Sequence, residues 1–142
     1  MSFSNPSDET IKAILSHPTT VAVVGCSENP ERDSLKIAQL LKAKGFHVIP
    51  VNPQLEPEAL RKALGERCYA DLASIPGPVE FVDVFRRSEY LPAIAEEAVA
   101  KGAKVLWGQL GVVEESAARH AQKAGLTVVM DRCPAIEYRR LF

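Results

Sequence analysis

The feature that most constrains the fold of this chain is a regular alternation of short apolar runs with longer amphipathic segments. Each of the five runs is rich in β-branched residues and nearly continuous in its apolar character. Such runs are typical of strands that are buried on both faces of a sheet. The runs are Val21–Val24, Val48–Val51, Phe81–Phe85, Val105–Trp107 and Thr127–Met130.

The segments between the runs have the spacing of amphipathic helices. Segment 34–44 carries an apolar stripe and is followed by Gly45, which suits a helix C-cap. Ser88 is a candidate N-cap for the helix that Gly102 ends. The expected helices are Asp8–Leu15, Ser34–Lys44, Glu56–Leu64, Ser88–Lys101, Glu114–Ala124 and Ala135–Arg140.

Strands that alternate with helices predict an α/β fold, here a Rossmann-like, doubly wound parallel sheet of five strands in three α/β/α layers. We expect the strand order 3-2-1-4-5 and a single domain over residues 1–142. Ligands of such sheets bind beyond the carboxyl ends of the strands, where the strand order reverses. The residues that follow each apolar run are therefore the candidates for a site.

Charge and composition limit the classes of partner and the cellular location that we expect for the protein. The net charge of −1 offers no broad basic surface for nucleic acid or for an acidic membrane. The N-terminus is polar, unlike a signal peptide, and no apolar run approaches the roughly 20 residues of a membrane span. The three cysteines, Cys26, Cys68 and Cys133, are an odd number at unrelated spacings. They favour reduced thiols and a cytoplasmic location.

The loop after the first run has the residues of a phosphate-binding turn. Gly25 permits a tight turn and a close approach of the backbone to a ligand. The helix that follows offers free N–H groups and the positive end of its dipole to an anion. Ser27 and Ser34 supply hydroxyl groups, and the guanidinium of Arg32 suits a phosphate.

The same loop departs from the pattern of dinucleotide-binding proteins. Ser27 and Pro30 occupy the second and third glycine positions of G-x-G-x-x-G, and the lysine of a P-loop is missing. Asn52-Pro53 follows the second run, where an NAD-binding protein usually has a carboxylate. These departures count against an NAD(P)-binding oxidoreductase or redox sensor. That class stays an alternative, in which Arg32 or Arg87 would bind a 2′-phosphate.

Further candidates follow the third, fourth and fifth runs. Arg86 and Arg87 suit contacts with the phosphate or adenine of a nucleotide. Phe85, beside them, offers a stacking surface or packs in the core. Trp107 is more often a packing residue than a ligand contact, but it stands beside Gly108, Gln109 and Leu110 at a sheet end. Cys133 also follows a strand, although no histidine lies near it in the sequence to activate it. We find no metal-ligand spacing, no nucleophile elbow and no acid–base pair.

Together the strand-end segments resemble the CoA-binding domain family, and specifically its small stand-alone bacterial members. The resemblance runs from about Ile11 to Arg140 and is carried by VAVVGCSENPERDS, VIPVNPQ, YADLASIPGPVEFVDVFRRSEYLP, VLWGQLGV and DRCPAIEY. The domain is similar to the N-terminal domain of the succinyl-CoA synthetase alpha subunit. The resemblance implies coenzyme A as the ligand. It also implies phosphate contacts at Gly25, Cys26, Ser27, Arg32 and Ser34, adenosine contacts at Asn52 and Pro53, nucleotide contacts at Phe85, Arg86 and Arg87, and pantetheine contacts at Trp107, Gly108, Gln109 and Leu110.

The resemblance also shapes the expected activity. The synthetases have further domains, including one with a phosphorylated histidine, whereas this chain ends at Phe142. We therefore expect a protein that binds CoA or an acyl-CoA without catalysis of its own, with no nucleic-acid or membrane partner. A CoA-site subunit of a split acyl-CoA synthetase is a further alternative.

Overall fold

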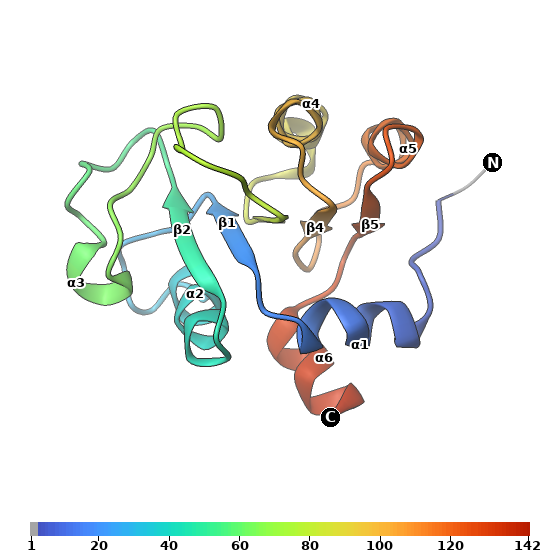
Figure 1. Ribbon diagram of the computed structural model, residues 1–142, viewed down its shortest axis with the longest axis horizontal. Coiled ribbons are helices and arrows are strands. Elements are labelled where there is room, and N and C mark those ends of the chain that lie inside the picture. The colour runs from blue at the N-terminus through green and yellow to red at the C-terminus, as the bar shows by residue number, and fades with distance from the viewer. Residues whose placement is uncertain (1–2) are drawn as a thin grey trace.

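The computed structural model describes residues 3–142 and contains one parallel sheet between two layers of helices (Figure 1). Neighbouring strands pair in parallel throughout, in the order β2-β1-β3-β4-β5. The strands are β1 Thr20–Val24, β2 His47–Val51, β3 Phe81–Val84, β4 Val105–Gly108 and β5 Thr127–Val129. The helices are α1 Asp8–Ser16, α2 Asp33–Ala43, α3 Arg61–Leu64, α4 Leu91–Lys101, α5 Glu115–Lys123 and α6 Pro134–Leu141, with a 3₁₀ turn η1 at Ser88–Tyr90.

The hydrophobic core lies in two parts, one on each face of the sheet. Helices α4 and α5 cover one face, where Val82 and Leu106 pack with Ile94. Helices α1, α2 and α6 cover the other face, where Phe81 and Trp107 are fully or almost fully buried. Because both faces are covered, the strands consist mainly of buried apolar residues with little alternation, as the sequence predicted. The three-layer α/β/α fold is confirmed.

The expected strand order, 3-2-1-4-5, is wrong. The run at 81–84 pairs with β1, not with the outer side of β2, which gives 2-1-3-4-5. The outer side of β2 is occupied by a single bridge between Val51 and Tyr69, where the N–H of Asn52 donates to the carbonyl of Tyr69 over 2.8 Å. A one-residue bridge has no apolar run, so the sequence pattern did not show it, and β3 takes the next free position beside β1.

Two helix starts also differ from expectation. Ser88 does not cap α4, which begins three residues later after η1. Its hydroxyl instead donates to the carbonyl of Gly111 over 3.1 Å and accepts from the N–H of Val113 over 2.9 Å, so it holds the loop after β4. Residues 56–60 form turns, and only Arg61–Leu64 is α-helical in the predicted helix Glu56–Leu64.

Candidate functional site

The order 2-1-3-4-5 reverses direction between β1 and β3, so the carboxyl ends of these two strands form the expected crevice. The turn after β1 lies at this crevice. Gly25 has φ +87°, and its N–H donates to the carbonyl of Val51 over 2.8 Å. A Cβ at this position would lie 2.9 Å from the carbonyl oxygen of Phe85. The turn therefore requires glycine both for its conformation and for its closeness to the end of β3.

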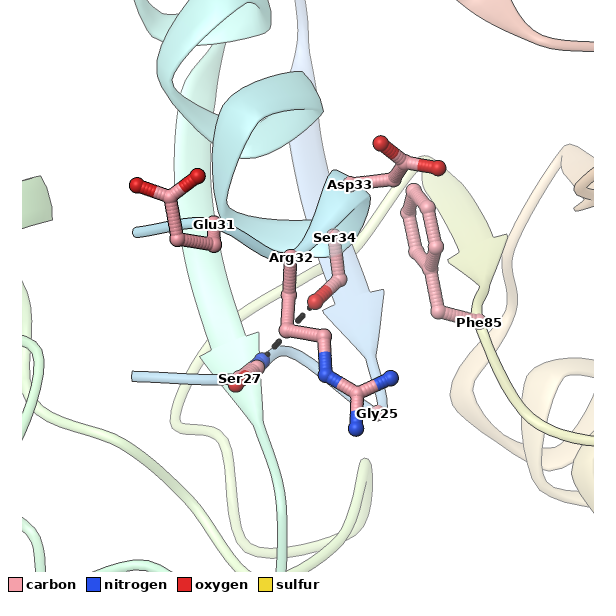
Figure 2. Close-up of a pocket in the computed structure, with 7 residues that line it drawn as sticks. All are labelled: Gly25, Ser27, Glu31, Arg32, Asp33, Ser34 and Phe85. Atoms are coloured by element: carbon pink, nitrogen blue, oxygen red, sulfur yellow. Dashed lines mark hydrogen bonds between the residues drawn. The ribbon is translucent and has the colours of Figure 1, made fainter. Parts of the chain in front are cut away.

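The loop from Gly25 to α2 is held by its own polar side chains. The buried hydroxyl of Ser34 accepts from the N–H of Ser27 over 2.9 Å (Figure 2). The hydroxyl of Ser27 in turn accepts from the N–H of Asn29 over 3.0 Å. Both serines thus shape the loop. Arg32 is the N-cap of α2 and makes no capping hydrogen bond with its side chain, so the first N–H groups of α2 keep no side-chain partner there.

A cavity of about 520 Å³ lies between this loop and Phe85. Figure 2 shows the guanidinium of Arg32 reaching from the start of α2 towards Gly25, while the carboxylate of Glu31 points away on the other side of the helix end. Asp33 lies near the Phe85 ring in the same view. The lining residues are Gly25, Ser27, Glu31, Arg32, Asp33, Ser34 and Phe85.

The two arginines after β3 share one contact and differ in the others. Both guanidinium groups pack on the ring of Tyr90, at 4.3 Å from the ring centre for Arg86 and 5.8 Å for Arg87. The Cδ atom of Arg86 lies 3.0 Å from the position that a Cβ would take at Gly25. Arg87 is 78% exposed at its side chain and pairs with Glu89, with 3.3 Å between Nε and Oε1. The aliphatic stem of Arg86 therefore lies against the glycine turn, whereas Arg87 lies beside Glu89.

Cys26 and Asn52 stabilise the loop, one by its buried side chain and the other by a hydrogen bond to the backbone. The side chain of Cys26 is fully buried, and burial, followed by the nearby Cys68 and Asp83, raises its pKa to about 12. The thiol therefore stays protonated, and Cys26 offers a ligand its backbone alone. Asn52 donates from Nδ2 to the carbonyl of Cys26 over 3.0 Å. This bond ties the end of β2 to the loop, while Pro53 is exposed beside it.

A second cavity, of about 430 Å³, adjoins the first through two shared residues, Asp33 and Phe85. Gln109 lines it and is only 6% exposed, and its Oε1 has no hydrogen-bond partner among residues 3–142. Leu110, by contrast, is 58% exposed at the rim. The wall is completed by α2 and α6, with the lining residues Asp33, Lys36, Ile37, Leu40, Phe85, Gln109, Leu110, Cys133, Ala135, Ile136 and Arg139.

Trp107 and Gly108 lie under the second cavity and not in its wall. Trp107 is 0% exposed, and its Nε1–H donates to the carbonyl of Arg132 over 2.9 Å. A Cβ at Gly108 would lie 2.8 Å from the carbonyl oxygen of Val112. In this structure Trp107 is a packing residue, and Gly108 allows the loop after β4 to fold back closely.

Sequence reasoning missed the contribution of α6 to the site. Cys133, Ala135, Ile136 and Arg139 lie on the wall of the second cavity, opposite residues of α2. One signal was available, because Cys133 directly follows a strand at the same sheet edge as Gly25. The remaining residues gave no signal, since the packing of α6 against α2 is a tertiary contact.

Residues 3–142 contain neither a cluster suited to a metal ion nor a helix suited to a membrane span. No group of three His, Cys, Asp or Glu side chains is arranged to hold a metal ion in that range. In the same range, no helix is long and apolar enough to cross a bilayer.

Comparisons with known proteins agree with the fold. A family model described as a CoA binding domain matches residues 19–139. An uncharacterized protein of Bacillus subtilis, YneT, is 42% identical over 129 residues, which cover 91% of this chain and 92% of YneT. The solved structure of a hypothetical protein from Pyrococcus horikoshii is 36% identical with a TM-score of 0.87, covering 99% of each chain.

A larger relative carries the same region as a small part of its length. An ADP-forming acetate–CoA ligase of Archaeoglobus fulgidus is 30% identical over 92 residues. The match covers 63% of this chain and only 13% of the ligase.

Proposed function

The chain belongs to the family of CoA binding domains, and we propose that it binds coenzyme A, free or acylated, at the carboxyl edge of its sheet. The observation that carries the proposal is the cavity at the start of α2, where the guanidinium of Arg32 reaches towards Gly25 and the stem of Arg86 lies against the same turn. Guanidinium groups and a helix N-terminus are strong partners for a pyrophosphate. Gly25 lines the cavity, and without a side chain it lets an anion there approach the backbone of the turn.

The second cavity fits the other end of the same ligand. Pantetheine is a flexible, largely apolar arm that carries two amide groups. The unpartnered Oε1 of Gln109 is a buried acceptor, and a turn of this side chain towards the cavity that it lines would let an amide N–H of the arm satisfy it. The two cavities meet at Phe85, so one extended ligand reaches both.

We propose that this protein binds its ligand without catalysing a reaction of it. No histidine lines either cavity, and the carboxylates there, Glu31 and Asp33, lie at the start of α2 without a partner base. The matched region makes up only 13% of the ligase named above, so most of that protein has no counterpart in the match.

A titration of the purified protein with CoA by calorimetry tests the proposal, with two adjacent arginines as a matched pair. Arg86→Ala removes the guanidinium of a side chain whose stem lies against Gly25, and a charged hydrogen bond is worth about 1.5–3 kcal/mol. We therefore expect its Kd to rise by about 10- to 100-fold. Arg87→Ala should leave the Kd within about twofold, because Arg87 faces Glu89.

Two results would contradict the proposal. Absence of heat at millimolar CoA in the unaltered protein would remove CoA as the ligand. Equal effects of Arg86→Ala and Arg87→Ala would mean that the arginines act only through general charge. NADPH in place of CoA serves as the comparison ligand, and tighter binding of NADPH would favour a dinucleotide site.

A further inference from the structure

Cys133 lies on the wall of the second cavity, and it differs from the other two thiols of the chain. Cys26 and Cys68 are buried in the core, where burial raises the pKa of each thiol. Cys133 is partly exposed, is not in a disulfide, and makes no capping hydrogen bond although it is the N-cap of α6. Of these thiols it is therefore the one that a molecule in the cavity can reach.

The same cavity contains an independent sign of a ligand. Oε1 of Gln109 is buried without a partner, and such an atom costs about 1–3 kcal/mol unless a donor fills its position. The apolar wall around it includes Ile37, Leu40 and Ile136. An amide-bearing chain with apolar sections satisfies both the acceptor and the wall.

The position of this cavity indicates which end of the ligand reaches Cys133. It adjoins the phosphate cavity through Asp33 and Phe85. If the phosphates lie at Arg32, as the proposed function requires, the arm runs past Phe85 and Gln109 and its thiol end arrives in the part of the cavity that α6 forms. A thiol terminus and a cysteine then share one small space.

We propose that Cys133 undergoes thiol–disulfide exchange with the disulfide of the ligand's own thiol, and so holds the ligand as a mixed disulfide. The proposal rests on the proposed function, because it takes CoA as the occupant of the two cavities. It gives the site a second state, in which an oxidised ligand is bound covalently and a reductant releases it.

The exchange balances with the disulfide as the oxidant. Cys133 loses its proton to solvent, and its sulfur attacks one sulfur of CoA disulfide. A new S–S bond forms between Cys133 and that half of the disulfide, while the original S–S bond breaks. The other half leaves as a CoA thiolate, which takes a proton from solvent. Cys133 is oxidised and one CoA sulfur is reduced, so no further reagent is needed.

The test is incubation of the reduced full-length protein with CoA disulfide, followed by intact mass measurement without reductant and by peptide mapping. We expect one CoA adduct per chain, located at Cys133 and reversed by dithiothreitol. Cys133→Ser should give no adduct, with its folding checked by thermal melting. Modification of Cys26 or Cys68 in place of Cys133 would overturn the proposal.

Glutathione disulfide separates a guided reaction from that of any accessible thiol. Because binding raises the local concentration of the reacting group, the rate with CoA disulfide should exceed the rate with glutathione disulfide at least tenfold. Gln109→Leu should reduce the rate with CoA disulfide several-fold and leave the rate with glutathione disulfide unchanged. Equal rates for the two disulfides would overturn the proposal.

A CoA titration under reducing conditions separates the two proposals. If CoA binds but CoA disulfide gives no adduct, the exchange at Cys133 is refuted and the proposed function stands. If CoA does not bind and both disulfides react alike, both proposals fail.

Discussion

Gly25→Ala perturbs the turn on which the candidate site depends. Gly25 has φ +87°, and this left-handed conformation costs a residue with a Cβ about 1–2 kcal/mol. The new Cβ would also lie 2.9 Å from the carbonyl oxygen and 3.1 Å from the carbonyl carbon of Phe85. Relief of this contact needs a backbone shift, which typically costs about 1–3 kcal/mol. Together the two effects lower the free energy of unfolding by about 2–5 kcal/mol.

Gly102→Ala is the matched control. Gly102 has φ +79°, so it shares the left-handed conformation, but an added Cβ there meets nothing within 4 Å. It should lose only the conformational part, about 1–2 kcal/mol. For a chain of this length, we expect the melting temperature to fall by about 6–15 °C for Gly25→Ala and by about 3–6 °C for Gly102→Ala.

Thermal unfolding followed by circular dichroism measures both changes, and a CoA titration supplies a second measurement. Gly25→Ala should also weaken CoA binding, because Phe85 and Arg86 move with the turn, whereas Gly102→Ala should leave the affinity unchanged. Equal melting temperatures for the two variants would refute the reasoning, since the approach of the turn to Phe85 would then cost nothing.

Two further predictions concern buried side chains. Trp107→Phe removes the Nε1–H donation to the carbonyl of Arg132 and leaves a small cavity. It should destabilise the fold by about 2–3 kcal/mol in a denaturant titration, with no change in CoA affinity. Weaker CoA binding at unchanged stability would assign Trp107 to the ligand. Burial raises the pKa of Asp83 well above its ordinary 3.8, so folding favours the protonated acid. The contribution of this protonated acid to the free energy of unfolding is then fully present below about pH 3.8. It is lost as the pH rises towards the raised pKa. Asp83→Asn removes this loss, so its melting temperature relative to the unaltered protein should increase as the pH rises above about 4. A difference independent of pH would contradict the assignment.

The sequence predicted the strands well because burial on both faces leaves a strong local signal. Runs such as Val21–Val24 are apolar at successive positions, and this pattern needs no knowledge of neighbours. The order of the strands was not predictable in the same way. It depended on the one-residue bridge at Tyr69, which takes the outer side of β2 and has no apolar run of its own.

The sequence also located the phosphate loop, since a glycine, two serines and an arginine before a helix are a local combination. It did not separate Arg86 from Arg87, because their contacts depend on residues from other parts of the chain. In the structure the stem of Arg86 lies against Gly25, and Arg87 pairs with Glu89. Trp107 shows the same limit, since burial within the sheet depends on Phe81 and the helices that cover it.

By itself, then, the sequence determined the layered α/β fold and the glycine turn at its ligand edge, because both follow from short stretches of chain. Tertiary structure decided which side chains meet at that edge. It placed Arg32 on the cavity that Gly25 lines, laid the stem of Arg86 against that turn, and placed Cys133 and Gln109 on one cavity wall. These residues come from separate elements, and only the packing of α2, α6 and the strand ends sets the distances between them.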